Sequence, residues 1–248
     1  MNTVLSIIIM LRLNSLNIDN NYMIADYIIG HLSEMKNKSI KQLSKDTFVS
    51  TTAILKFCNL IGFDTYSKFK NALSSTIETR KLQLLEKNKL LNPEEILNYI
   101  DSFASKKIDQ DVFKNQIDQV VLKIKEYKAI HFYGATFPLA LTTSFIEDMA
   151  LLGIYVNTHQ DNYEIRKIEN HPGVHIMVTL SGRYVEANRN SYIQITSLDY
   201  PSVIISKNVI NMNDINYCIQ LPETKSSQYD EVVLLLLLDY ILLQFLKN

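Results

Sequence analysis

The chain has little glycine, proline or cysteine, and each shortage narrows the structures that it can form. Its 248 residues include 6 Gly, 5 Pro and 2 Cys. Few Gly and Pro residues favour long helices over elaborate loops. The two cysteines, Cys58 and Cys218, lie far apart, provide no disulfide framework and fit a reducing compartment. We therefore expect a cytoplasmic protein.

Long hydrophobic runs are also missing. Residues 4–11 are strongly apolar, but the run ends at Arg12, well short of the roughly 20 residues that span a bilayer. The run also lacks the basic start and the small-residue cleavage site of a signal peptide. A second run, residues 234–238, is followed by Asp239. We expect both runs to be packing helices, and we predict no membrane partner.

Motifs of several enzyme and metal classes are absent from the sequence. The chain contains no P-loop and no G-x-S-x-G nucleophile motif. His171 and His175 are four residues apart, but Pro172-Gly173 between them prevents a helical pair of metal ligands. Histidines within strands, such as His131 and His175, are expected to pack. The sequence therefore predicts no metal and no cofactor.

Charge is distributed unevenly along a nearly neutral chain. Residues 1–81 carry ten Lys and Arg against six Asp and Glu, whereas the remainder carries fifteen against twenty. A mildly basic first third followed by an acidic remainder fits an N-terminal DNA-binding domain followed by a ligand-binding domain.

Residues 39–70 have the pattern of two short helices around a tight turn. Ser39 is a suitable N-cap for the first helix, the turn is expected at residues 46–49, and Ser50 is suited to cap the second. Gly62 would end the second helix. Ala53, Ile54 and Phe57 share its apolar face. Two core helices with ordinary caps would produce the same short pattern.

The outward face of the second helix is suited to nucleic acid. Short hydroxyl side chains near a helix N-terminus suit base edges and phosphates, and a lysine further along suits a phosphate. We predict that the DNA-binding residues are Ser39, Ser50, Thr51, Thr52, Lys56 and Lys70.

This segment resembles the N-terminal domain of RpiR-type transcriptional regulators. In that family the second helix follows the pattern vS-x-x-t-i-x-r-f-x-k-x-l-G-f-x-g-y-x-x-f-k. The matching residues here are Val49-Ser50, Ile54, Lys56-Phe57, Leu60, Gly62-Phe63, Tyr66 and Phe69-Lys70. Two positions depart from the pattern: Lys56 stands where Arg is usual, and Thr65 where Gly is usual. The resemblance implies a double-stranded DNA operator as a partner.

The remaining sequence changes from helical periodicity to an alternation of strands and helices. The helical pattern after Lys70 runs toward Glu86 and breaks at residues 88–93. Helices are predicted at 93–104, 111–125 and 138–152, one through 186–193, and a buried one at 229–246. Strands are predicted at 129–133, 154–156, 174–180, 202–205 and 217–221. This alternation predicts a parallel sheet with helices on both faces.

The second half, from about Phe113 to Leu221, resembles a SIS (sugar isomerase) domain, the partner domain of RpiR-type regulators. In that family the first strand ends in G-x-G-x-S and the third in S-x-S-G-x-T, and the loops hold the phosphate of a phosphosugar. The resemblance implies a ligand site at the carboxyl ends of these strands. The candidate residues are Gly134, Thr136, Thr179, Ser181, Gly182, Arg183, Tyr184 and Glu186.

Two departures from the SIS motifs leave alternatives open. Pro138 replaces the serine of the first motif and supplies neither a hydroxyl nor an N–H. Tyr184 replaces the threonine of the second and is bulky for a site close to phosphate. The SIS fold could therefore serve dimerisation alone. A phosphosugar isomerase, with Glu164 or Glu186 as its base, is a third and weaker hypothesis.

The sequence thus predicts a non-enzymatic regulator of the α+α/β class. An all-α helix-turn-helix domain spans residues 1–86, and a linker with a connecting helix spans 87–110. Residues 111–248 form a SIS domain with a parallel, flavodoxin-like sheet flanked by helices, which senses a phosphorylated sugar and dimerises. We expect a homodimer or homotetramer, because one recognition helix reads too few base pairs for useful specificity.

Overall fold

The chain folds into two compact units. The computed structural model describes residues 3–15, 17–160, 168, 170–207 and 214–247. The first unit comprises Met1–Lys87 together with Ile146–Tyr155, and the second comprises Asn88–Phe145 together with Val156–Asn248. The first unit is thus built from two separate segments of the sequence.

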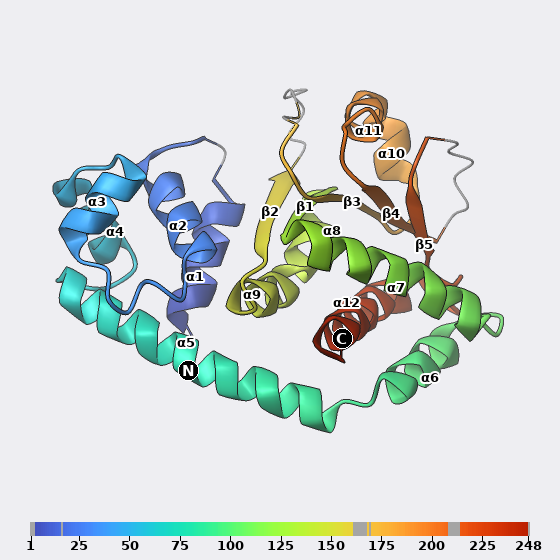
Figure 1. The fold of residues 1–248 in the computed structure, drawn as a ribbon. Helices are drawn as coiled ribbons and strands as arrows, with labels where there is room; N and C mark the ends of the chain where they lie inside the picture. Colours follow the sequence, from blue (N-terminus) through green and yellow to red (C-terminus); the bar gives the residue numbers. More distant parts are fainter. Residues whose placement is uncertain (1–2, 16, 161–167, 169, 208–213, 248) are drawn as a thin grey trace. The chain divides into compact units, whose positions relative to one another are not determined.

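The first unit is helical (Figure 1). Its helices are α1 (Thr3–Leu13), α2 (Asn20–Gly30), α3 (Ile40–Thr47), α4 (Thr51–Leu60) and α5 (Tyr66–Leu90), the last of which runs three residues beyond the boundary of the unit. Apolar side chains of α1, α2, α3 and α4 are fully buried, among them Ile8, Ile28, Leu43 and Phe57.

The two apolar runs of the sequence, residues 4–11 and 234–238, lie in the packing helices α1 and α12, as predicted. Of the described helices, none has the length and hydrophobicity needed to cross a bilayer.

Aromatic packing fixes the start of α5 against α4. The Phe57 and Phe69 rings meet edge to face, with their centroids 6.3 Å apart. The Tyr66 hydroxyl donates a hydrogen bond of 2.9 Å to the carbonyl of Lys38, just before α3. Burial raises the pKa of Tyr66 to about 12. These contacts hold the two short helices in one arrangement.

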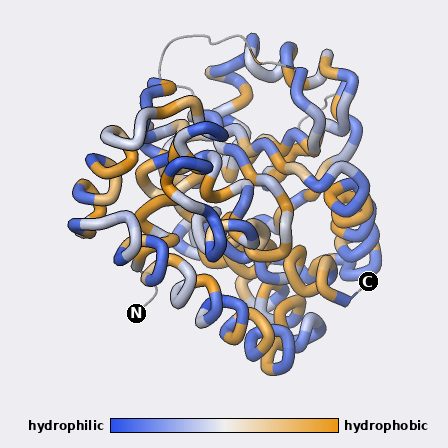
Figure 2. Tube along the Cα trace, turned by 60° about the vertical axis from the view of Figure 1, so that its left-hand side comes forward, coloured by the Kyte–Doolittle hydropathy of each residue, from blue (hydrophilic) through white to orange (hydrophobic). Residues whose placement is uncertain are grey.

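The second unit is an α/β structure (Figure 1). Its helices are α6 (Pro93–Phe103), α7 (Gln110–Tyr127), α8 (Thr136–Leu141), α10 (Arg183–Ala187), α11 (Arg189–Thr196) and α12 (Asp230–Lys247); α9 (Thr143–Leu151) begins in it. A 3-10 turn, η1 (Ser227–Tyr229), leads into α12. Helix α12 is hydrophobic along most of its length (Figure 2) and contacts α6, α7 and α8. Most of its apolar residues are buried as predicted, but Val232 and Leu235 are exposed.

Five strands form the sheet in the order β2-β1-β3-β4-β5. They are β1 (Ala129–Gly134), β2 (Tyr155–Gln160), β3 (Val174–Thr179), β4 (Ser202–Ser206) and β5 (Tyr217–Gln220). The pairs β1–β3, β3–β4 and β4–β5 are parallel. All described residues of β1, β3 and β4 are buried, as expected for strands covered on both faces. The order and direction confirm the predicted flavodoxin-like sheet.

Helices cover the two faces of this sheet. On one face, Tyr133, Met177 and Ile204 form a hydrophobic cluster with residues of α10 and α11. Helices α7 and α12 lie on the opposite face (Figure 1). The loop after β1 and the loop after β3 therefore leave the same edge of the sheet, because carboxyl ends of parallel strands coincide.

Several predicted element boundaries differ from the structure. The strand predicted at 154–156 is β2, which runs from Tyr155 to Gln160. Helix α5 continues past Glu86 to Leu90. The helix predicted at 138–152 is two helices, which meet at Thr142, where the Thr142 Oγ1 donates to the Leu139 carbonyl at 2.7 Å. The helix predicted through 186–193 is likewise divided, at Asn188. In neither case does a Gly or Pro mark the break in the sequence.

Candidate DNA-binding and ligand sites

Helices α3 and α4 form the predicted helix-turn-helix, and side chains cap both of them. Ser39 Oγ accepts a hydrogen bond from the Gln42 amide at 3.2 Å, and Gln42 Oε1 accepts one from the Ser39 amide at 2.9 Å. Ser50 Oγ accepts from the Ala53 amide at 3.2 Å. Such caps satisfy amides that the first turn leaves without a helical partner. The caps predicted at both serines are confirmed.

The turn is shorter than predicted. Asp46 and Thr47 belong to the last turn of α3, and Phe48 closes that helix with a left-handed backbone. Val49 is buried, as the prediction requires of the residue that plugs the angle between the helices. Only Phe48, Val49 and Ser50 therefore connect α3 to α4.

The predicted DNA-binding residues lie on three helices. Thr51, Thr52 and Lys56 are exposed on α4, directly after its cap Ser50. Thr52 and Lys56 are four residues apart and share one face of the helix. Lys56 forms no ion pair within the described part of the chain. The structure thus groups Ser50, Thr51, Thr52 and Lys56 on one element.

The other two predicted residues lie outside α4. Ser39 begins α3, and its hydroxyl is engaged in the cap. Lys70 is half-buried on α5. Their contact with DNA stays a prediction.

A second group of predicted residues lies where β1 and β3 end. Gly134 pairs with Val178 across the two parallel strands. A Cβ added at Gly134 would lie 2.9 Å from the Val178 carbonyl oxygen, so this close approach requires glycine. The structure therefore brings the loops after Gly134 and Thr179 together, as the sequence predicted for neighbouring strands.

The side chains around these loops differ in exposure. Thr136 is exposed at the first position of α8, whereas Thr179 is buried at the end of β3. Ser181 is half-buried, and its Oγ accepts a hydrogen bond of 3.0 Å from Arg183 Nε. Gly182 has a left-handed backbone, with φ of 79°, and precedes α10. The Arg183 guanidinium is exposed beside the loop.

The last two predicted residues lie on α10 but in different surroundings. Tyr184 packs against the hydrophobic cluster that contains Tyr133 and Met177. Glu186 is exposed. Glu164, the other base considered for an isomerase, lies outside the described residues.

Comparison with known proteins identifies the helical part. Residues 4–80 match the model of the helix-turn-helix domain of the rpiR family. No curated protein sequence matches the chain. Among solved structures, the Vibrio vulnificus NanR protein complexed with ManNAc-6P is similar at 15% identity, with a TM-score of 0.45, over 91% of this chain and 85% of that chain.

The unit that contains residues 4–80 also holds buried ion pairs that the sequence does not predict. Arg80 of α5 lies 3.2 Å from Glu147 and 3.0 Å from Asp148, and Lys87 lies 3.2 Å from Asp148. Both carboxylates come from α9 and are buried. Burial raises the pKa of Glu147, and the positive charge of Arg80 opposes this rise. An acidic pair in a helix ordinarily indicates a solvated face, so only the packing reveals these partners.

A second buried charge in this unit is Arg12. Its guanidinium lies 2.9 Å from Asp26 Oδ1 and 3.2 Å from the Tyr155 hydroxyl, which also donates to Asp26 at 3.0 Å. Burial raises the pKa of Tyr155. Tyr155, like Glu147 and Asp148, belongs to the segment 146–155, so polar contacts hold that segment against α1, α2 and α5.

Four of the five histidines gather on the sheet of the α/β unit. His131 and His175 pair across β1 and β3, and their rings stack with centroids 4.8 Å apart. His159 stacks on Tyr133 at 4.6 Å, and His171 stacks on His131 at 6.1 Å. Among described residues, no group of three or more His, Cys, Asp or Glu is placed to hold a metal ion. The cluster is therefore best described as an aromatic stack.

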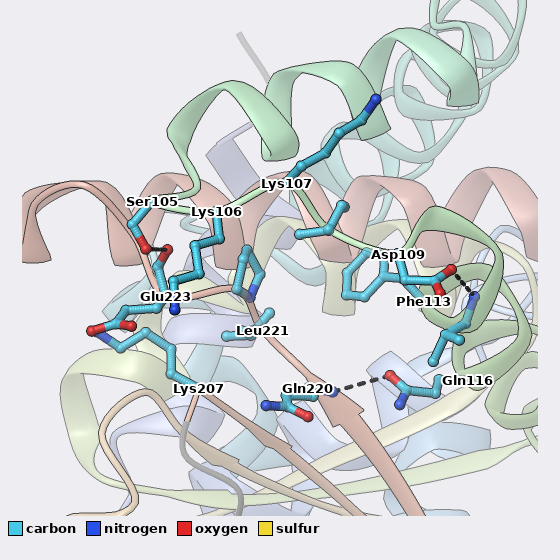
Figure 3. Close-up of a pocket in the computed structure, with 13 residues that line it drawn as sticks. Ser105, Lys106, Lys107, Asp109, Phe113, Gln116, Lys207, Gln220, Leu221 and Glu223 are labelled. Carbon is cyan, nitrogen blue, oxygen red and sulfur yellow. Dashed lines mark hydrogen bonds between the residues drawn. The ribbon is translucent and has the colours of Figure 1, made fainter.

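A pocket of about 360 Å³ lies at the end of β5 (Figure 3). The residues that line it include Ser105, Lys106, Phe113, Lys207, Gln220 and Glu223. Lys207 Nζ lies 2.5 Å from Asp230 Oδ2. None of the residues predicted to bind a ligand is among those that line this pocket. It is thus distinct from the site at the ends of β1 and β3.

Proposed function

We propose that the chain is a DNA-binding transcriptional regulator of the RpiR type whose α/β unit senses a phosphorylated sugar. The observation that carries the proposal is the rpiR-family match over residues 4–80, with exposed hydroxyls and a lysine on the capped helix α4. In this proposal α4 is the recognition helix. A location in the cytoplasm and the absence of catalysis follow from that role.

The proposed DNA-binding residues make two kinds of contact, with base edges and with phosphates. Thr51 and Thr52 lie in the first turn of α4, where a recognition helix meets base edges. Lys56 lies one turn further along and suits a phosphate, which positions the helix without reading sequence. We propose that Ser39 and Lys70, from the flanking helices, contact the phosphate backbone of the DNA.

The ligand site is proposed at the adjoining ends of β1 and β3. A phosphate there would meet Thr136, Thr179, Ser181 and the amides that follow Gly182, with Arg183 supplying positive charge. Gly134 allows the two strands to approach closely. Glu186, exposed on α10, is proposed to meet sugar hydroxyls.

The two motif departures support a competing role for the α/β unit. Pro138 lies within α8 and adds no donor, and Tyr184 packs against the hydrophobic cluster instead of supplying a small hydroxyl. Under this alternative the unit has lost sugar binding and serves dimerisation only.

We propose that the protein acts as a homodimer or homotetramer. Two recognition helices would then read half-sites about one DNA turn apart, or a multiple of it. Val232 and Leu235, exposed hydrophobic residues of α12, are available to an interface. Light scattering at micromolar concentration is expected to give at least twice the 28.6 kDa of one chain; a monomer would contradict this part of the proposal.

One experiment tests both halves of the function. The full chain is used to select duplexes from a randomised library, and its affinity for an enriched duplex is measured with and without a panel of sugar phosphates. The panel includes ManNAc-6P, and the matching unphosphorylated sugars are controls. We expect an enriched duplex, and an affinity that changes with one phosphosugar. Failure to enrich any duplex would contradict the DNA-binding role, whereas insensitivity to the whole panel would favour the dimerisation-only alternative.

A further inference from the structure

Phe48 occupies an unusual place between α3 and α4. Its side chain is 92% exposed, the most exposed of the large hydrophobic residues described. Its backbone is left-handed, with φ of 55° and ψ of 25°, and its amide bonds back to the carbonyls of Lys45 and Ser44 to close α3. Helices commonly close in this way on glycine, because a Cβ disfavours the left-handed conformation.

The helix-turn-helix fold does not require a phenylalanine at this position. The neighbouring residues supply the packing: Thr47 and Val49 are both buried, and Thr47 Oγ1 donates to the Leu43 carbonyl at 2.7 Å. Glycine or asparagine would close α3 with less backbone strain and without exposing a ring to water. The ring is therefore unfavourable in the free protein on two independent counts.

The position of the ring indicates what it contacts. Phe48 precedes Ser50, the N-cap of α4, by two residues, so the two Cα atoms are at most about 7 Å apart. The ring thus lies at the end of α4 that carries Thr51 and Thr52, the end that a recognition helix directs to base edges. The apolar group that duplex DNA presents in the major groove is the thymine 5-methyl, and phenylalanine is one of the side chains that reads it.

We propose that Phe48 is a specificity-determining residue that packs on a thymine methyl group in the major groove. The inference rests on the proposed DNA-binding function and adds a base preference to it. Threonine and serine hydroxyls hydrogen-bond to several bases, whereas an apolar ring distinguishes thymine from cytosine and from uracil. Removing the ring and the methyl group from water on binding offsets the exposure of the ring in the free protein.

The test uses Phe48→Gly and Phe48→Asn, two variants whose residues tolerate the left-handed backbone. We expect both to melt at or above the wild-type temperature and to bind the duplex selected by wild type about three- to tenfold more weakly. Leu82→Ala, which removes a hydrophobic side chain exposed on α5, is the matched control and is expected to leave binding unchanged.

A second arm removes only the methyl group. Each thymine of the selected duplex is replaced in turn by deoxyuridine. We expect one position per half-site at which this replacement weakens binding by wild type but not by Phe48→Gly. Equal binding by wild type and Phe48→Gly, or uracil effects of the same size in both, would overturn the inference while leaving the proposed function intact. Failure of wild type to select any duplex would overturn both.

The oligomeric state separates a DNA contact from a protein contact. If Phe48→Gly dissociates the oligomer in light scattering and shows no change in its response to deoxyuridine, the ring packs on another protein chain and the inference is wrong. If Phe48→Gly keeps the oligomeric state of wild type but no longer responds to deoxyuridine, the inference is supported.

Discussion

Arg80 of α5 and Asp148 of α9 form a buried ion pair, in which Nη2 lies 3.0 Å from Oδ1. The Asp148 side chain is only 3% exposed, and that of Arg80 is 18% exposed. Lys87 is the second cation on Asp148, and Glu147 is the second carboxylate beside Arg80. Two cations, Arg80 and Lys87, therefore balance two buried carboxylates.

Replacing Arg80 should destabilise this cluster strongly. Arg80→Met keeps much of the side-chain volume but leaves Glu147 and Asp148 buried with Lys87 alone. Breaking a buried pair on one side costs about 3 kcal/mol or more, because a charge loses its partner without regaining water. Urea unfolding followed by far-UV circular dichroism measures the loss.

The matched control is Lys36→Met. Lys36 pairs with Glu78 of α5 at 3.0 Å, but the two side chains are 69% and 65% exposed. An exposed pair of this kind contributes less than about 1 kcal/mol. Equal losses of stability in the two variants would mean that the buried cluster is no more important than a surface pair.

Stability should fall on mild acidification because of His175. Burial lowers the pKa of this side chain from its ordinary value of 6.5. Its Nε2 lies 3.1 Å from the His171 carbonyl oxygen, and its Nδ1 lies 2.9 Å from the Tyr133 hydroxyl. The unfolded chain takes up a proton near pH 6.5, whereas the folded chain does so only at lower pH. Protonation thus favours unfolding, and stability is lost as the pH drops below that value.

Melting temperatures of wild type and His175→Gln between neutral pH and pH about 5 test this assignment. We expect the wild-type curve to fall more steeply over that interval than the variant curve. His31→Gln, at the end of α2 in the other unit, is the control and should retain the wild-type slope. Parallel curves for wild type and His175→Gln would show that another group governs the pH dependence.

Ser181→Ala should weaken phosphosugar binding. Its hydroxyl lies in the loop after β3 and accepts a hydrogen bond of 3.0 Å from Arg183 Nε, so its loss would remove a proposed ligand contact and release the guanidinium. A lost hydrogen bond to a charged group costs about 1–3 kcal/mol of binding free energy. Titration calorimetry with a phosphosugar that binds wild type measures this difference.

Ser105→Ala distinguishes the two candidate ligand sites. Ser105 lines the pocket at the end of β5, away from the predicted ligand residues. We expect its replacement to leave phosphosugar binding unchanged. If Ser105→Ala weakens binding and Ser181→Ala does not, the ligand occupies the β5 pocket and the assignment to β1 and β3 is wrong.

Local patterns sufficed to predict the strands and the helix-turn-helix. The strands around Phe132 and Ile204 are short apolar runs with clear ends, and Ser39 and Ser50 are strong cap signals. The close approach of Gly134 to Val178 also follows from topology, once parallel neighbours are assumed.

Features that depend on distant packing were not predicted. Glu147 and Asp148 have no partner nearby in the sequence, and their cations come from α5. The helix divides at Thr142, where no Gly or Pro marks the break and the threonine side chain hydrogen-bonds to the Leu139 carbonyl. Phe48 was predicted only as part of a turn, because its left-handed backbone and its exposure are properties of the folded chain.

The central claim, that α4 is the recognition helix, is tested most directly by the salt dependence of duplex binding for Lys56→Glu. Lys81→Glu, which makes the same charge change at an exposed position of α5, is the control. We expect Lys56→Glu to bind at least about tenfold more weakly at low salt, with a slope of log K against log salt reduced by about one, and Lys81→Glu to bind nearly as wild type does. Wild-type affinity and slope for Lys56→Glu would contradict the assignment of α4 to the DNA groove.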